Sequence, residues 1–157
     1  PHKKWWELDL DEFDHLKVER SIELTDMTAF KDKPVHTLSG GQRQRAFLSL
    51  ALAQDAKTLL LDEPTTFLDL RYQLQFLDLL KKLNQEEELS IITVIHDVNL
   101  AARYCDRIAV IKDGQLLAID SPREVLSKEL MKQAFQVETH QIETPIGFQI
   151  CIIKPDY

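Results

Sequence analysis

Apolar residues follow two patterns along the chain, and each pattern indicates one kind of secondary structure. A recurrence every three or four positions gives a helix one apolar face, and a short unbroken run indicates a strand that is buried on both faces. The helical spacing and the capping residues predict helices over residues 9–25, 40–53, 70–83 and 98–104, from Ser121 onward, and over 127–135. Apolar runs and alternating stretches predict strands over residues 58–61, 90–95, 107–111, 115–119 and 148–153.

The order of these elements indicates the fold class. Strands that alternate with helices are typical of an α/β fold with a largely parallel sheet. We expect the strands 58–61 and 90–95 to be buried in that sheet. The region before Leu38 contains only a predicted helix and a loop over 31–37, so we expect a separate helical subdomain at the N-terminus. The helix over 70–83 should bury a stripe made of Leu70, Leu74, Leu77 and Leu80.

Length and charge narrow the possible functions. The chain has 157 residues, which is enough for one domain with a hydrophobic core. Its net charge of −7 argues against a nucleic-acid-binding surface, so we expect no nucleic-acid partner. It has no run of about 18 apolar residues, so we expect none of it to span a membrane. Because it begins abruptly at Pro1 without an initiator methionine, we expect it to be a piece of something longer.

The sequence LSGGQ over residues 38–42 is the first candidate for chemistry. Ser39 can cap the following helix, and its hydroxyl can also reach a ligand oxygen. Gly40 and Gly41 lack side chains, so their amides can approach a bound group closely, and the start of a helix adds positive potential. This arrangement suits the outermost phosphate of a nucleotide. The alternative is a capped helix that simply follows a loop.

An acidic pair follows the predicted strand 58–61, in the sequence TLLLDEP. Open α/β sheets bind their ligands at the carboxyl ends of the strands. There, Asp62 could hold a magnesium ion, which prefers hard oxygen ligands, and Glu63 could orient or deprotonate an attacking water. The alternative is that the two acids only cap the next helix.

A histidine follows the predicted strand 90–95 at the same end of the sheet. His96 could donate a hydrogen bond to a terminal phosphate oxygen, and it would reach the same ligand as the acidic pair. The alternative is an ordinary polar residue at a strand end, whose hydrogen bonds are satisfied within the protein.

Taken in order, LSGGQ, LLLDEP, the FLD sequence that contains Asp69, and TVIH resemble the ATP-binding subunit of ABC transporters. In that family these stretches are the signature motif, the Walker B motif, the D-loop and the switch histidine. The resemblance covers residues 9–135 and implies a P-loop NTPase-like ABC ATPase. It divides the chain into a helical signature-motif subdomain over 1–54, a partial RecA-like catalytic core over 55–135 and a C-terminal strand region over 136–157.

The resemblance implies specific roles in binding and hydrolysing MgATP. Asp62 corresponds to the Walker B aspartate that helps to place Mg²⁺, Glu63 to the catalytic base for water, and His96 to the residue that contacts the γ-phosphate. Residues 39–42, which are Ser39, Gly40, Gly41 and Gln42, correspond to the surface that reaches ATP held by a second subunit.

The resemblance also implies partners and a location. Asp69 corresponds to the D-loop residue that meets the second nucleotide-binding subunit, because two such subunits enclose two ATP molecules in a head-to-tail dimer. The dimer drives a transmembrane permease, so the protein would be peripheral, at the cytoplasmic face of the cell membrane. Trp5 and Trp6 precede the helical subdomain, and they either lie near the surface that meets the permease or belong to the core of that subdomain.

Two motifs of the family are absent from the chain. A P-loop requires a glycine followed by lysine, and none of the four glycines has one; no glutamine precedes Leu38, so the Q-loop is absent too. We expect that the chain is truncated and lacks the first part of the catalytic core. We also expect that the chain on its own does not hydrolyse MgATP. Without the P-loop strand, residues 91–95 would have an unpaired edge, so the chain should self-associate there or pair that edge with residues 107–111.

The type of ABC protein is indicated by weaker signals. Pro1-His2 and the stretch 121–138 resemble the importers of iron-siderophore complexes and vitamin B12, so we expect an importer of a metal chelate. The ATP-binding subunit does not itself recognise the transported substrate. The alternatives are an ABC-type ATPase that is not coupled to a permease, and a non-catalytic regulatory remnant.

Overall fold

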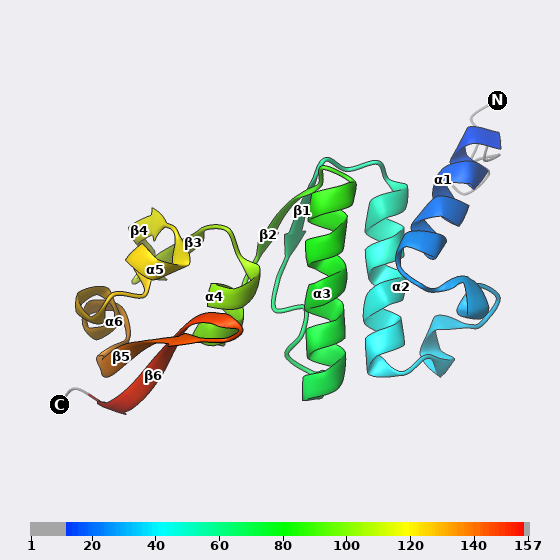
Figure 1. Ribbon diagram of the computed structural model, residues 1–157. Coiled ribbons are helices and arrows are strands. Elements are labelled where there is room, and N and C mark those ends of the chain that lie inside the picture. Colours follow the sequence, from blue (N-terminus) through cyan, green and yellow to red (C-terminus); the bar gives the residue numbers. More distant parts are fainter. Residues whose placement is uncertain (1–11, 156–157) are drawn as a thin grey trace. The chain divides into compact units, whose positions relative to one another are not determined.

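The computed structural model describes residues 12–155, and the chain divides between Val94 and Ile95 into two compact units (Figure 1). We call residues up to Val94 unit 1 and residues from Ile95 unit 2. The predictions for Pro1-His2, Trp5 and Trp6 fall outside the described residues. Across residues 12–155, no helix has both the length and the apolar character needed to cross a membrane.

Unit 1 contains four helical segments before its first strand, then a strand, a long helix and a second strand. They are α1 (Glu12–Leu24), η1 (Thr28–Phe30), η2 (Val35–Thr37), α2 (Gly40–Ala53), β1 (Thr58–Leu61), α3 (Leu70–Glu86) and β2 (Ser90–Thr93). The predicted loop over 31–37 therefore includes the short 3₁₀ turn η2. The helix α2 and the strand β1 have the predicted bounds, because capping and turn residues mark their ends in the sequence.

The core of unit 1 is built around α3, which lies beside α2 in Figure 1. Five side chains of α3 are buried, namely Phe76, Leu77, Leu79, Leu80 and Leu83. Leu48 of α2 and Leu59 of β1 are buried as well. The predicted stripe is wrong at its first member: Leu70 is 69% exposed because it is the first residue of the helix, ahead of the turns that pack.

The strands β1 and β2 form a parallel pair, in which Leu60 lies opposite Ile92 and Leu61 opposite Thr93. The prediction that both faces are buried is wrong. Leu59 is 5% exposed, whereas Leu60 is 76% exposed, because successive side chains point to opposite faces and α3 packs along only one of them.

Neither outer edge of this parallel pair has a partner strand in the described part of the chain. β2 pairs with β1 alone, and residues 107–111 do not pair with it, because β3 pairs with β4; the alternative in which they close the gap is therefore wrong. Leu60 and Ile92, which lie opposite each other on the two strands, are both exposed and form an apolar surface on one face of the pair. An unpaired edge beside apolar side chains is a template for another chain.

We expect the 157-residue chain on its own to self-associate through this surface. Burial of a large apolar side chain stabilises an association by about 1.5–3 kcal/mol. Sedimentation velocity should show oligomers for the wild-type chain and a shift toward monomer for Ile92→Lys. Ile111→Lys, a matched change at an exposed strand position of unit 2 (68% exposed), should leave the distribution unchanged. A monodisperse wild-type monomer whose amides exchange fast along residues 91–95 would show that this prediction is wrong.

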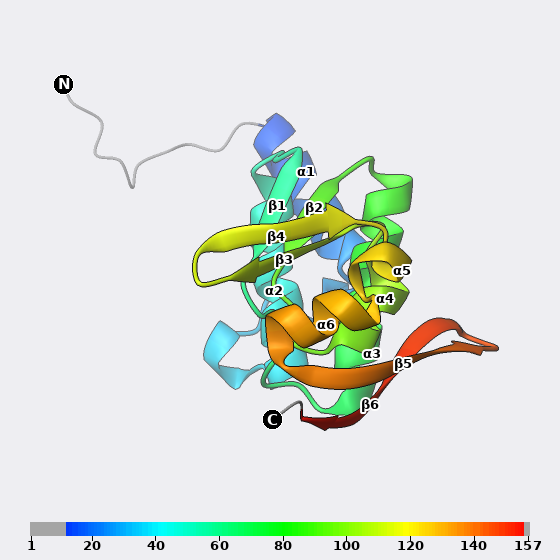
Figure 2. The same cartoon turned by 90° about the vertical axis from the view of Figure 1, so that its left-hand side faces the viewer.

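Unit 2 contains one helix, an antiparallel hairpin, two short helices and a second antiparallel hairpin. They are α4 (Val98–Tyr104), β3 (Ile108–Lys112), β4 (Gln115–Asp120), α5 (Pro122–Val125), α6 (Lys128–Phe135), β5 (Val137–Thr144) and β6 (Gly147–Pro155). Within this unit, Figure 2 shows α6 between the two hairpins. The strand β5 was not predicted, because its sequence VETHQIET has no clear alternation of apolar and polar residues.

The α/β class agrees with the structure, but the sheet is not largely parallel. In residues 12–155 the only parallel pairing is β1 with β2, and the other two sheets are antiparallel hairpins. The reason is the length of the connections, because parallel strands need a crossover and antiparallel strands need only a turn. Asp113 and Gly114 both have positive φ and close such a turn between β3 and β4.

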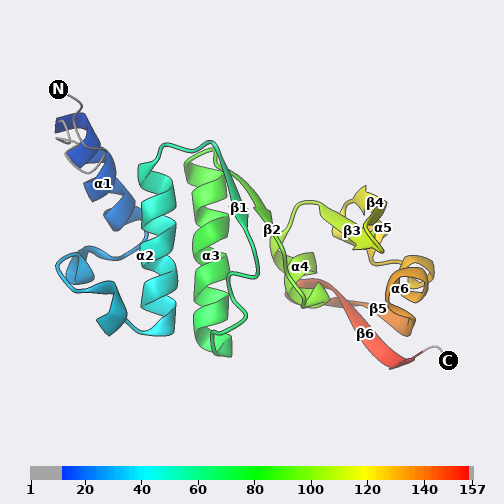
Figure 3. The ribbon, with the colours of Figure 1, turned by 180° about the vertical axis from the view of Figure 1, so that it is seen from behind.

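The core of unit 2 joins α4 and α6 to the second hairpin. Leu126, Met131 and Ile150 are buried together, and apolar side chains from α4, β3, β5 and β6 pack against them: Val98, Ala102, Ile108, Val137 and Phe148. Figure 3 shows α4 against β6 within this unit. The structure divides the chain between Val94 and Ile95. The subdomain boundaries predicted after residues 54 and 135 come from the family resemblance, and they stay a prediction.

Candidate active site

The signature-like sequence begins α2 with a reciprocal cap. The backbone N–H of Gln42 donates to the Ser39 hydroxyl at 3.4 Å, and the backbone N–H of Ser39 donates to Oε1 of Gln42 at 3.0 Å. Ser39 therefore caps the helix, as one interpretation predicted. Because the hydroxyl accepts in this bond, its own proton can still be donated, and Ser39 is exposed.

The two glycines of this sequence lie close to residues that follow the acidic pair. A Cβ atom added to Gly40 would lie 3.7 Å from Cδ2 of Leu68, and one added to Gly41 would lie 3.4 Å from Cδ1 of Tyr72. Both distances are ordinary van der Waals contacts, so packing within the described chain does not by itself require glycine at either position.

Residues just after the signature-like sequence fasten α2 to its neighbours. Nε2 of Gln44 donates to the carbonyl oxygen of Pro64 at 2.8 Å, which ties α2 to the loop after the acidic pair. Nη1 of Arg45 donates to the carbonyl oxygen of Thr25 at 3.1 Å and to Oδ2 of Asp26 at 2.8 Å. These contacts hold the first turns of α2 in a defined place, and the sequence alone did not reveal them.

The acidic pair after β1 does not cap a helix. The cap of α3 is Asp69, whose Oδ1 accepts from the N–H of Tyr72 at 3.2 Å. The interpretation of Asp62 and Glu63 as simple helix caps is therefore wrong. Asp62 is exposed, and its carboxylate makes no hydrogen bond or ion pair with any other residue among 12–155.

Glu63 has an unusual backbone conformation. Its φ is +44°, a region that a residue with a side chain seldom adopts, and its Oε2 accepts from the Thr66 hydroxyl at 2.9 Å. Such positions cost about 1–3 kcal/mol and persist where the surroundings enforce them, which is common at functional sites. Five other described residues with side chains, among them Asp113 and Gln136, also have a positive φ, so this conformation is that of a turn residue and the chemical role of Glu63 stays a prediction.

The predicted D-loop residue has a clear structural role. Asp69 caps α3, and in the same segment Nε2 of Gln73 donates to the buried Thr65 hydroxyl at 3.3 Å. The loop from β1 to α3 is thus held from its far end. A contact between Asp69 and a second subunit stays a prediction.

His96 lies in unit 2, directly before α4, and it is exposed. The next residue, Asp97, caps α4: its Oδ1 accepts from the N–H groups of Asn99 at 2.8 Å and Leu100 at 3.0 Å. The structure therefore gathers residues 39–42, the acidic pair and Asp69 in one region of unit 1, and it places His96 in the other unit.

Asp62 fits one part of a magnesium site. Across the part of the chain that the structure describes, no three His, Cys, Asp or Glu side chains gather closely enough to hold a metal by themselves. Mg²⁺ usually keeps several waters and takes one or two carboxylates plus phosphate oxygens of a substrate. An exposed carboxylate without a protein partner suits that role, and the remaining ligands would come from water and nucleotide.

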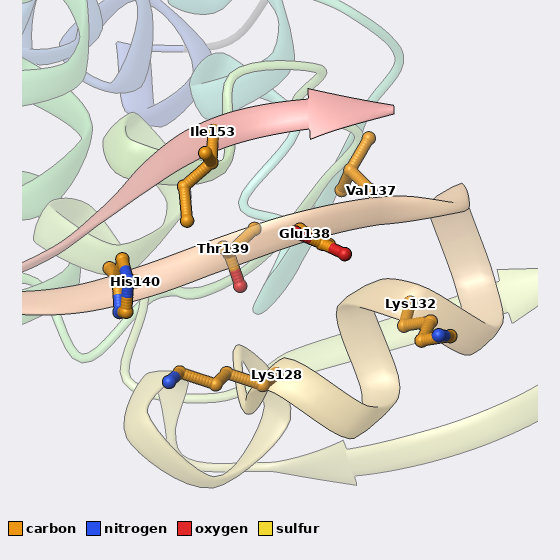
Figure 4. Close-up of a pocket in the computed structure, with 7 residues that line it drawn as sticks. All are labelled: Lys128, Lys132, Val137, Glu138, Thr139, His140 and Ile153. Atoms are coloured by element: carbon orange, nitrogen blue, oxygen red, sulfur yellow. The ribbon is translucent and has the colours of Figure 1, made fainter. Parts of the chain in front are cut away.

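Two hollows in the structure are lined by none of the predicted site residues. A hollow of about 240 Å³ in unit 2 lies between α6 and the β5–β6 hairpin (Figure 4). Its lining residues are Lys128, Lys132, Val137, Glu138, Thr139, His140 and Ile153. A second hollow, of about 230 Å³, lies among α1, η1 and α2 in unit 1 and is mainly apolar. Among the predicted site residues, Ser39, Asp62, Asp69 and His96 are exposed.

The chain is similar in sequence to known proteins of one family. Residues 3–66 match a family model described as ABC transporter. The petrobactin import ATP-binding protein FpuD of Bacillus anthracis is 43% identical over 97% of the chain and 56% of its own length. The chain belongs to the ABC transporter ATP-binding family. The sequence-based assignment to this family is confirmed.

Other members of this ABC family give the same result. The iron(3+)-hydroxamate import ATP-binding protein FhuC of Bacillus subtilis strain 168 is 40% identical over 87% of the chain and 51% of its own length. A chain from an inward-facing transporter, assigned to the metal-chelate type, has a TM-score of 0.82 at 24% identity and shares the fold over 95% of this chain and 59% of its own. The chain thus spans just over half the length of these relatives.

Proposed function

We propose that this chain is the signature and Walker B part of an ATP-hydrolysing subunit of an ABC importer. One observation carries the proposal: the acidic pair leaves β1 without capping a helix, and the start of α2 is fastened beside it through Gln44 and Pro64. The P-loop that would complete the subunit is not among the 157 residues. Its place in the protein would be on the N-terminal side of this chain, as the family resemblance implies.

In this proposal each residue of the site has a separate task. Asp62 would hold Mg²⁺, which supplies positive charge to the phosphates when it is bound. Glu63, held by Thr66, would accept a proton from the attacking water or orient it. His96 would donate a hydrogen bond to the terminal phosphate.

The start of α2 would serve a second nucleotide. Ser39 can donate its hydroxyl proton. The first backbone N–H groups of a helix have no acceptor within the helix, and they carry the positive end of the helix dipole. An exposed site of this kind suits ATP that is held by a second subunit. Asp69 and residues 39–42 would then lie at the interface of a head-to-tail dimer.

We propose a transmembrane permease as the other partner, which would place the protein at the cytoplasmic face of the membrane. Supporting this, the apolar hollow of unit 1 lies in the helical region and includes Val18, Ile22 and Leu50 in its lining. Apolar surface that is open to solvent is typical of a contact site.

We propose a ferric chelate as the transported substrate, on the basis of the petrobactin and iron(3+)-hydroxamate names of the two relatives. Cells that lack the gene should lose uptake of radiolabelled iron supplied as one of these chelates. The wild-type gene should restore uptake, and a gene with Glu63→Gln should not. Normal uptake in the deleted strain, together with MgATP hydrolysis by the purified protein, would favour an ABC ATPase that acts without this permease.

A further inference from the structure

The helix that follows His96 is fastened to the C-terminal hairpin by one side chain. Oδ1 of Asn99 accepts from the backbone N–H of Ile150 at 2.8 Å, and Nδ2 of Asn99 donates to the carbonyl oxygen of Ile150 at 3.1 Å. The amide thus bonds both backbone groups of one residue, as a neighbouring strand would. The two residues are 51 positions apart in the chain.

The partner of this amide is a buried part of unit 2. Ile150 is 3% exposed and belongs to the buried cluster with Leu126 and Met131. Val98 and Ala102, which flank Asn99 on α4, pack against the same cluster. Apolar packing is non-directional, whereas a pair of hydrogen bonds fixes both the position and the rotation of the helix.

The first turn of α4 is therefore held from two sides. Asp97 caps it through the N–H groups of Asn99 and Leu100, and the Asn99 side chain binds it to β6. His96 lies directly before this turn, so the backbone that carries its imidazole ring is fixed by the same contacts. Figure 3 shows α4 beside β6.

We propose that Asn99 is a positioning residue for His96, and that the β5–β6 hairpin acts through it to hold that histidine where it can contact a phosphate. This inference rests on the proposed function, in which His96 binds the terminal phosphate. It makes the C-terminal hairpin a part of the ATPase machinery, although the hairpin carries none of the family motifs.

The experiment uses the protein in a form that includes the P-loop, and it compares Asn99→Ala, His96→Ala and the double variant. Asn99→Ala should lower kcat for MgATP hydrolysis by about 10- to 100-fold, because a small misplacement of a group that contacts the reacting atoms has such an effect. The affinity for ATP, measured in a Glu63→Gln background, should fall much less than kcat, because a P-loop supplies most of the contacts to the phosphates. In the His96→Ala background, Asn99→Ala should have no further effect, since the two residues act as one unit.

A matched control separates positioning from general destabilisation. Asn84 also donates from its side chain to a backbone carbonyl, that of Leu89 at 2.9 Å, but it lies in unit 1. Asn84→Ala should leave kcat close to that of the wild type. Asn99→Asp keeps the acceptor for Ile150 and loses the donor, so it should give an intermediate kcat, and it carries the test if Asn99→Ala does not fold.

The possible results distinguish a failure of the positioning role of Asn99 from a failure of the proposed function on which it rests. If His96→Ala lowers kcat but Asn99→Ala does not, or if the two effects multiply in the double variant, the positioning role is wrong and the proposed function stands. If the wild-type protein does not hydrolyse MgATP, or if His96→Ala changes nothing, the proposed chemistry fails first and the inference fails with it.

Discussion

Glu63→Gln, made in a form of the protein that includes the P-loop, is expected to lower the rate of MgATP hydrolysis by about 10²- to 10⁴-fold, the usual contribution of a general base. Glutamine has the shape of glutamate and can still accept a hydrogen bond from the Thr66 hydroxyl, so the loop should keep its conformation. It is a very weak base, so only the chemical step should suffer. The rate is measured at saturating ATP, and ATP binding is measured separately by calorimetry.

The control for this variant is the same chemical change at a distant position. Glu23 is an exposed residue of α1, so Glu23→Gln removes one negative charge without touching the acidic pair. It should hydrolyse ATP at the wild-type rate. Turnover of Glu63→Gln close to that of the wild type would assign the base to another residue, and weakened ATP binding would indicate a role in holding the nucleotide.

The second large effect concerns the 157-residue chain on its own, which should neither bind MgATP tightly nor hydrolyse it. The amides and the lysine of a P-loop supply most of the contacts to the phosphates in this class of ATPase, and no glycine of this chain is followed by lysine. Asp62 and the start of α2 provide too few contacts to replace them. Calorimetry should detect no micromolar binding, whereas a longer form with the P-loop should bind under the same conditions.

A positive control is needed to show that the isolated chain is folded when it fails to bind. Circular dichroism should report its helices, α3 above all, because α3 is the longest and its buried residues form the core of unit 1. Micromolar affinity for MgATP in the isolated chain would show that its own residues suffice to bind a nucleotide. The proposal that the P-loop supplies most of the phosphate contacts would then be wrong.

The local elements and the family were largely determined by the sequence. Ser39 before a helical run, proline and acidic residues after β1, and the aspartate–glycine pair between β3 and β4 mark the ends of elements within a few positions. The order of the motifs then sufficed to identify the ABC family. Signals of this kind are short-range, because each depends on neighbours in the chain.

The tertiary structure decided which surfaces and side chains meet. The single covered face of β1, the contact of Gly41 with Tyr72, and the bond from Gln44 to Pro64 depend on how α2 and α3 pack. No local pattern encodes such contacts, because they join segments that lie far apart in the chain.

The same limit applies to the roles of single polar residues. The sequence left open whether the acidic pair or another residue caps α3, and the structure assigns the cap to Asp69. It also left Asn99 without a role, since its partner is the backbone of Ile150, and a backbone group carries no sequence signal. Local propensity therefore determined where the helices and strands lie, while long-range packing decided which polar groups remain available for chemistry.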